Sequence, residues 1–272
     1  MWLQYYKPEE ASFTWWLETL DKKFGKPSVR ELIVMFGYSG IWKTEYSFFV
    51  ARRNAEAWKL VQYFSLELPE YDMKQRICLS RAAVSKYEFQ TNKYTQTQKD
   101  IMDWTYLELE AISNLKIIWQ EDKTIDWIIE QIQIWYNNWC KMFFIDNLDK
   151  VTLKYWWDNE NARYQSITSR LQDLKNKLNV CIILIHHAKK QFNTAQMSTP
   201  AWVEWLRWSQ KIVDNSTQIF EVFRDLDPDS YDFADNVTQI FQLKDTFWWP
   251  KGYQKIQFSH WWYIDYINPR KH

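Results

Sequence analysis

The chain has 272 residues, of which 46% are hydrophobic and 25% are charged, with 34 basic and 34 acidic side chains. This length suits a single α/β domain, and the hydrophobic content excludes a disordered chain. The formal net charge of zero excludes a global attraction for nucleic acid, so any such binding must use local basic loops. No stretch reaches 18 apolar residues and no signal peptide opens the chain, so we expect a cytoplasmic protein with no membrane partner.

Cysteine usage points to a reducing compartment. The three cysteines, Cys78, Cys140 and Cys181, are far apart in the sequence, and two of them lie in apolar runs. Such residues behave as small buried hydrophobes. Their spacing predicts neither a disulfide framework nor a metal site.

Strand-like and helix-like segments alternate through most of the chain. Residues 1–30 read as a lead-in segment with a short helix at about 17–23. The strands expected next are 32–36, 60–65, 115–118, 142–145 and 180–185. The helices expected between them are 44–57, 69–84, 95–114, 124–138 and 160–178. This alternation predicts a mainly parallel central sheet flanked by helices.

The end of the chain has a different pattern. A long polar loop at 188–210 leads to a run of strands without intervening helices, expected at 217–224, 237–244, 253–258 and 262–266. Such a run predicts an antiparallel extension of the parallel sheet. We therefore expect an α/β fold with one domain at residues 31–267, preceded by the lead-in segment.

Residues 37–44, with the sequence GYSGIWKT, match the phosphate-binding pattern G-x-x-x-x-G-K-[ST] except that Trp42 stands where the second glycine belongs. An apolar strand precedes the segment and a helix follows it, so backbone N–H groups and the helix dipole converge there on an anion. The alternative is a chance glycine turn. The predicted ATP-binding residues are Gly37, Ser39, Gly40, Trp42, Lys43 and Thr44, with Lys43 reaching the phosphates and Thr44 holding Mg²⁺. An indole at position 42 is expected to fill the nucleotide's place.

The composition suggests an explanation for Trp42. The chain has 19 tryptophans but only 4 glycines, whereas average usage gives roughly 19 glycines at this length. Trp58 and Trp139 each follow a predicted helix, where a left-handed residue such as glycine is usual, and Trp208 lies in the long loop. Our hypothesis is that many tryptophans are glycines in the living protein, through UGA codons that some bacterial lineages read as glycine. The alternative is a native protein rich in tryptophan.

Acidic and basic residues at the ends of the predicted strands are candidates for chemistry on ATP. Asp146 ends an apolar strand, as a Walker B aspartate does, and is predicted to bind Mg²⁺ through water. Glu67 ends the strand after the phosphate-loop helix, at the sheet edge where ligands bind in open α/β folds. It is the candidate catalytic base, and a charge at a helix N-terminus is the alternative.

The next strand ends in His186 and His187. His187 is predicted to hydrogen-bond the γ-phosphate and report its loss; a metal site and a structural histidine are the alternatives. Lys189 and Lys190 begin the long loop and are candidates for contact with a nucleic-acid backbone, although such residues are often merely solvated.

These motifs in this order resemble the RecA-like ATPase domain of DnaB-type replicative helicases. The run FSLEL at 64–68 is similar to that family's F-S-L-E-M, whose glutamate is the catalytic base, and FIDNL at 144–148 is similar to its Walker B strand. The segments TNKYT at 91–95, LNV at 178–180 and LRWSQ at 206–210 also resemble family motifs, the last one if Trp208 is read as glycine. The likeness covers residues 13–266.

The resemblance implies an ATP-hydrolysing helicase motor that needs ATP and Mg²⁺. It implies a hexamer around single-stranded DNA, with Arg207 among the DNA-contacting residues and a primase or a helicase loader as a further partner. The family's sensor is commonly glutamine, and His187 takes that place here. Its late K-x-R motif completes the neighbouring subunit's site; this chain keeps Lys244, a predicted catalytic residue, but has Thr246 in place of the arginine, and Arg224 is a candidate substitute.

Two other functions stay open from the sequence. One is a DNA-dependent ATPase of the recombinase or plasmid-replication type, which binds DNA without unwinding it. The other is a DNA-binding scaffold that does not hydrolyse ATP, which a genuine Trp42 would imply.

Overall fold

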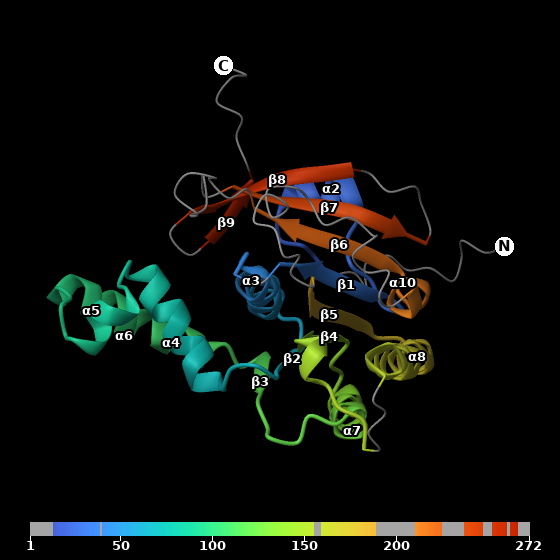
Figure 1. Cartoon of the computed structure of the whole chain (residues 1–272). Coiled ribbons are helices and arrows are strands. Elements are labelled where there is room, and N and C mark those ends of the chain that lie inside the picture. Colours follow the sequence, from blue (N-terminus) through green and yellow to red (C-terminus); the bar gives the residue numbers. More distant parts are fainter. Residues whose placement is uncertain are drawn as a thin grey trace.

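The computed structural model describes residues 13–38, 40–154, 159–188, 210–224, 237–246, 252–259 and 262–265. In these ranges the strands form one sheet with the order β3-β2-β4-β5-β1-β6-β7-β8-β9 (Figure 1). The strands are β1 (Leu32–Gly37), β2 (Val61–Ser65), β3 (Leu115–Ile118), β4 (Met142–Asp146), β5 (Cys181–His187), β6 (Gln218–Phe223), β7 (Val237–Asp245), β8 (Gly252–Ser259) and β9 (Trp262–Asp265).

Helices cover both sides of the sheet. Figure 1 shows α3 and the group α4–α6 on one side and α8 and α10 on the other. The helices are α2 (Glu18–Phe24), α3 (Lys43–Glu56), α4 (Glu70–Arg81), α5 (Lys86–Gln90), α6 (Gln96–Ala111), α7 (Ile125–Asn137), α8 (Glu160–Leu178) and α10 (Gln210–Asn215), with a 3-10 turn, η1 (Leu148–Lys150), after β4. None of these helices combines the length and the apolar character needed to cross a bilayer.

The expected parallel sheet with an antiparallel extension is confirmed, with one difference in where the extension begins. Strands β1 to β5 pair in parallel, and β6 also runs parallel to β1. Antiparallel pairing starts only at the β6–β7 pair and continues through β8 and β9. The short helix α10, which the sequence patterns did not predict, precedes β6. The carboxyl ends of β1, β2, β4 and β5 therefore meet at one edge.

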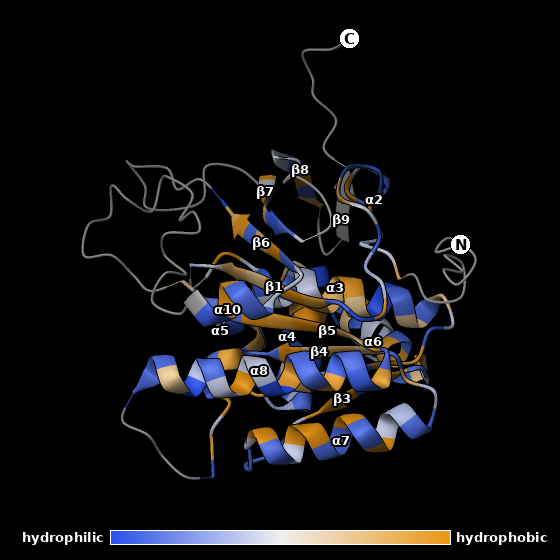
Figure 2. Cartoon of the chain, turned by 90° about the vertical axis from the view of Figure 1, so that its right-hand side faces the viewer, coloured by the Kyte–Doolittle hydropathy of each residue, from blue (hydrophilic) through white to orange (hydrophobic). Residues whose placement is uncertain are grey.

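The core follows from the strand sequences. Every residue of β1, β2 and β4 is buried, as expected for parallel strands with helices on both faces. Helices α7 and α8 alternate hydrophobic and hydrophilic residues along their length (Figure 2). Part of the predicted lead-in segment joins this core, because Trp15 and Phe24 pack edge-on against Phe220 of β6. The domain boundary at residue 30 stays a prediction.

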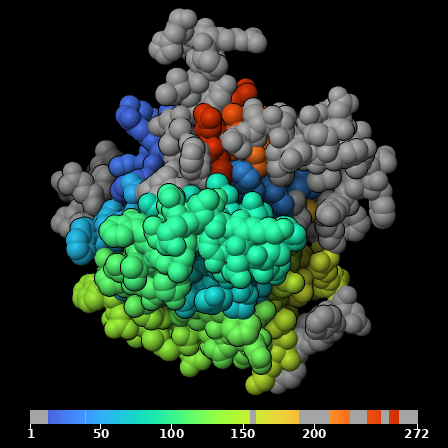
Figure 3. All heavy atoms as spheres, turned by 90° about the vertical axis from the view of Figure 1, so that its left-hand side faces the viewer, coloured from blue at the N-terminus to red at the C-terminus, as the bar shows by residue number. Residues whose placement is uncertain are grey.

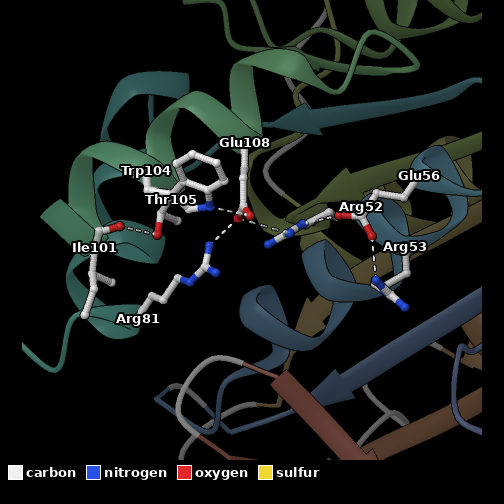
Figure 4. Close-up of polar contacts among 8 residues, drawn as sticks. All are labelled: Arg52, Arg53, Glu56, Arg81, Ile101, Trp104, Thr105 and Glu108. Carbon is white, nitrogen blue, oxygen red and sulfur yellow. Dashed lines mark hydrogen bonds and ion pairs between the residues drawn. The ribbon is translucent and has the colours of Figure 1, made fainter.

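The three helices between β2 and β3 form a projecting group, α4–α6, that covers the centre of one face (Figure 3). An ionic network fastens this group to the phosphate-loop helix α3 (Figure 4). Glu108 of α6 pairs with Arg81 of α4 and lies 4.0 Å from Arg52 of α3, and it accepts a 2.7 Å hydrogen bond from the Trp104 indole. The sequence patterns missed α5, a five-residue helix that starts at a capping box on Ser85.

Tryptophan occupies backbone positions that suit glycine. Trp16, Trp42, Trp58 and Trp139 have φ angles of 63°, 65°, 64° and 70°. This left-handed region costs an L-residue about 1–2 kcal/mol. Trp58 and Trp139 each follow the C-cap residue of a helix, α3 and α7 respectively, and these tryptophans are 85% and 84% exposed. The left-handed backbone expected at these two helix ends is confirmed.

Candidate active site

The phosphate loop connects β1 to α3, and two glycines shape it. A Cβ atom added at Gly37 would lie 2.3 Å from the backbone oxygen of Val222 on β6, so the strands leave no room for a side chain. Gly40 has a φ of 86°, a conformation that side chains rarely adopt. Trp42 then takes the N-cap position of α3 with left-handed angles. Ser39, a predicted ATP-binding residue, lies outside the described residues.

Lys43 begins α3 and turns back into the loop. Its ammonium donates a 2.5 Å hydrogen bond to the carbonyl oxygen of Tyr38, and the residue is 4% exposed. Burial lowers the pKa of Lys43 to about 8, although the nearby carboxylates of Asp146 and Glu45 act in the opposite direction. The ammonium is therefore enclosed by the loop that the sequence predicts to wrap phosphate.

Asp146 ends β4 in a fully enclosed position. Its Oδ2 atom accepts a 2.8 Å hydrogen bond from the hydroxyl of Tyr63 on β2. Ser47 of α3 lies 2.8 Å from the same hydroxyl. Burial raises the pKa of Asp146 to about 6, against the opposing effects of the Tyr63 hydrogen bond and the nearby Thr44 hydroxyl. Its Oδ1 atom is buried and has no hydrogen-bond partner among the described residues.

Glu67 lies two residues beyond the end of β2. Its Oε2 atom accepts a 2.7 Å hydrogen bond from the side-chain amide of Asn147 and lies 3.6 Å from Nε2 of His187. Burial and the charge of Lys43 lower the pKa of His187 below its usual value. At neutral pH the imidazole is therefore uncharged and can donate or accept a hydrogen bond.

A second polar cluster, centred on Asp149, lies at the carboxyl end of β5 next to His187. Asp149 of η1 lies 3.0 Å from Nδ1 of His186, accepts a 2.5 Å hydrogen bond from the Tyr164 hydroxyl, and accepts a 3.4 Å bond from the backbone N–H of His187. Burial alone would raise the pKa of Asp149, but its contacts with His186 and Tyr164 hold that pKa well below the usual range. The ionised carboxylate thus ties the end of β5 to α8.

The predicted residues converge on one polar cavity of about 210 Å³. Its lining includes Lys43, Thr44, Glu67, Asp146 and His187, together with Gly40, Trp42 and Arg76. An apolar cavity of about 180 Å³ adjoins it and shares part of this wall. One edge of the sheet thus holds a lysine, a hydroxyl, two carboxylates and a neutral histidine around a single space.

The Trp42 indole forms part of the wall between the two cavities. Its ring meets Phe258 of β8 edge-on, with 4.4 Å between ring centroids. The guanidinium of Arg224 lies 3.7 Å from the centroid of the indole ring. Arg224 is 2% exposed and stands beside the phosphate loop of its own chain, so its role as a finger toward a neighbouring subunit stays a prediction.

The remaining predicted residues lie away from the cavity or outside the described ranges. The ammonium of Lys244 on β7 donates to the carbonyl oxygens of Val213, Asp214 and Ser216, at the end of α10. Thr246 donates through its backbone and its hydroxyl to the carbonyl of Thr217. Lys189, Lys190 and Arg207 fall outside the described residues, as does Trp208.

Three residues that contact the predicted set had no clear sequence signal. Tyr63 lies in an apolar strand, where an aromatic residue is expected to be part of the hydrophobic core. Asn147 and Asp149 follow the Walker B aspartate in a segment without a periodic pattern. The only sequence feature that pointed to Asn147 and Asp149 was their position, one and three residues after Asp146.

Comparison with known proteins agrees with this geometry. A family model, the DnaB-like helicase C terminal domain, matches residues 14–244. Two solved structures share the fold. The first is the ATPase domain of G40P, with a TM-score of 0.81 at 15% identity; the match covers 95% of this chain and 94% of that chain. The second is a DnaB-like replicative helicase studied with its primase interactions, with a TM-score of 0.84 at 14% identity; the match covers 97% of this chain and 66% of that chain.

No curated protein matches the chain significantly. At 14–15% identity the structural likeness shows the RecA-like fold alone. The family model, in contrast, spans most of the described residues and both carboxylate-bearing strands. The chain therefore belongs to the family of DnaB-like helicase C-terminal domains.

Proposed function

We propose that this chain hydrolyses ATP and uses the energy to move along single-stranded DNA as the motor domain of a replicative helicase. The family is one of nucleotide-hydrolysing helicase domains. The single observation that carries the proposal is the convergence of Lys43, Thr44, Glu67, Asp146 and His187 on one cavity at the carboxyl edge of the parallel strands. Ligands of open α/β sheets bind at this edge.

Each residue has a role that its position supports. The backbone around Gly37 and Gly40 is shaped to wrap phosphate, and Lys43 is close enough to this loop to reach the β- and γ-phosphates. Glu67 is held at the mouth of the cavity, where a carboxylate can accept the proton of an attacking water. The uncharged His187 beside it is placed to hydrogen-bond the γ-phosphate.

The residues present also fit Mg²⁺. The buried Oδ1 atom of Asp146 has no hydrogen-bond partner among the described residues, and hard oxygen ligands are what Mg²⁺ prefers. Thr44 and Asp146 would hold the ion, the latter through water. When bound, the ion neutralises charge on the phosphates of ATP.

We propose glycine as the functional residue at position 42. The left-handed φ of 65° suits glycine, and the Trp42 ring occupies part of the cavity wall. A non-hydrolysing scaffold is the function that a genuine tryptophan favours. The test of the main proposal is ATP hydrolysis by the glycine form with and without single-stranded DNA: hydrolysis that DNA stimulates supports it, and absence of hydrolysis refutes it.

Assembly and partners belong to the same proposal. We propose a homo-oligomer, a hexamer by analogy with the family, in which Lys244 acts at the neighbouring ATP, with Lys189, Lys190 and Arg207 on the DNA side. A primase or a loader is the further partner, since one solved relative is described with primase interactions. Unwinding of a forked duplex separates the helicase from a recombinase-type ATPase, which would hydrolyse ATP without opening the fork.

A further inference from the structure

We propose that Tyr63 and Asn147 are positioning residues that hold the two carboxylates of the site, each acting across the β2–β4 pair. Tyr63 on β2 holds Asp146 at the end of β4, and Asn147, just after β4, holds Glu67, just after β2. The inference rests on the proposed function of the same site. It adds two residues to that site and gives each a separate effect: Tyr63 on metal binding and Asn147 on turnover.

Tyr63 fixes the orientation of the Asp146 carboxylate. Both residues are fully or almost fully buried, at 0% and 2% exposed, and the strands pair in parallel with Ser65 opposite Asp146. The Tyr63 hydroxyl donates its single proton to Oδ2 of Asp146, and it lies 2.8 Å from the Ser47 hydroxyl, which in turn donates to the carbonyl oxygen of Thr44. With Oδ2 engaged in this way, Oδ1 is the oxygen left for an outside ligand.

Asn147 restricts a side chain that is otherwise mobile. The Glu67 side chain is 46% exposed, and an exposed glutamate samples several rotamers. Asn147 is 1% exposed, so its amide offers a rigid donor, and the 2.7 Å bond fixes the Oε2 atom of Glu67. A base held in one place keeps the attacking water aligned, which is where positioning contributes most to rate.

The two contacts are separable by experiment. Residues that orient metal ligands typically affect metal affinity about 10–100-fold, whereas a hydrogen bond to a catalytic base acts on the chemical step. We therefore expect Tyr63→Phe to weaken metal binding and leave turnover at saturating metal almost unchanged. We expect Asn147→Leu to lower kcat about tenfold or more with unchanged metal and nucleotide affinity.

The experiment uses the full chain with Trp42→Gly as the parent. Mn²⁺ affinity is measured by equilibrium titration in the presence of ATPγS, and kcat and KM are measured with Mg-ATP. Tyr46→Phe removes a hydroxyl from another buried tyrosine, on α3, and Asn114→Leu removes a side-chain amide that donates to the carbonyl oxygen of Ala55, away from the cavity. Both control variants are expected to behave like the parent. If Asn147→Leu does not fold, Asn147→Ala takes its place.

A double mutant isolates the path through Glu67. In a Glu67→Gln background, Asn147→Leu is expected to lower kcat no further, because its partner has already lost its function. The inference is overturned if Tyr63→Phe and Asn147→Leu change Mn²⁺ affinity and kcat alike, if they match the controls, or if the double mutant shows additive losses. A parent that binds neither ATPγS nor Mn²⁺ refutes the proposed function together with this inference. A parent that binds both, with unaltered variants, refutes this inference alone.

Discussion

Replacing Trp42 by glycine is the most informative single change in this chain. The backbone at this position is left-handed, with φ 65° and ψ 31°, and an L-residue pays about 1–2 kcal/mol for that conformation. Glycine removes this strain. It also removes the edge-on contact with Phe258 and the stacking of Arg224, which are worth about 0.5–1.5 and about 0.5–2 kcal/mol respectively.

These contributions oppose each other, so we expect the stability of the ligand-free protein to fall by no more than about 2.5 kcal/mol. Nucleotide binding should respond far more strongly. A ligand present at a hundredfold excess over its Kd stabilises the folded state by about 2.7 kcal/mol. We therefore expect Mg-ATP to raise the Tm of the Trp42→Gly form clearly and to leave the Tm of the Trp42 form unchanged.

The assay is thermal unfolding of both purified forms with and without Mg-ATP, followed by direct titration of the nucleotide. Trp58→Gly is the matched control, because it relieves the same left-handed strain at an exposed helix end. It should raise stability by about 1 kcal/mol without affecting nucleotide binding. Comparable ATP affinity in the two forms at position 42 would refute the steric argument, and UGG codons at positions 42, 58, 139 and 208 would refute recoding.

Three further predictions concern catalysis, assembly and pH. Glu67→Gln should lower turnover about 10²–10⁴-fold with ATP binding nearly intact, whereas Lys43→Ala should weaken ATP binding itself; normal turnover by Glu67→Gln would move the base elsewhere. Lys244→Ala should abolish DNA-stimulated hydrolysis while ATP binding persists, and hydrolysis per subunit should rise with protein concentration; constant activity in dilute monomers would contradict this. Burial raises the pKa of Glu31 from 4.5 to about 7, so Glu31 should contribute a loss of about 3 kcal/mol of stability as pH rises through that window. Glu31→Gln should remove this contribution, seen as a smaller difference between the unfolding free energies measured below pH 4.5 and above pH 7 than in the parent.

Much of the fold follows from local sequence patterns. The buried strands β1, β2 and β4 are short apolar runs bounded by polar residues, and helix α7 has Ile125, Ile128 and Ile132 buried on one face. Such patterns predict element type because burial on a sheet or a helix face has a fixed period. The short helices α5 and α10 escaped prediction because five or six residues are too few to show that period.

Residues of the candidate site could be predicted from the sequence where a motif assigns a chemical role to a particular position. Lys43, Glu67, Asp146 and His187 all end or follow strands, and parallel strands bring their carboxyl ends to one edge. The roles of Tyr63 and Asn147 were not predictable in the same way. They depend on which side chains face each other across β2 and β4, and the register of two strands about 80 residues apart is set by the whole core.

Two contrasting settings occur among the tryptophans that the structure describes. Trp15 is 2% exposed, donates its indole N–H to the carbonyl of Gly25 and packs on Phe220. These are the contacts of a genuine core tryptophan, and its φ is not in the left-handed region. Trp58 and Trp139 combine left-handed backbones with side chains that are more than four-fifths exposed. The combination of a left-handed backbone and an exposed side chain is what favours glycine at these two positions; the exposed Trp104 and Trp119 lack the left-handed φ and do not favour it.

This contrast limits what recoding would change. The strands that carry Glu67 and Asp146 are packed by Phe, Ile and Tyr side chains, so the edge of the sheet has the same architecture in either form of the chain. Among the left-handed tryptophans, Trp58 and Trp139 lie at exposed helix ends, and Trp16 lies under the Arg53 guanidinium, 4.4 Å from it. Only Trp42 lines the polar cavity. We therefore expect glycine at the other three left-handed positions to change stability alone, and glycine at position 42 to determine whether the cavity accepts a nucleotide.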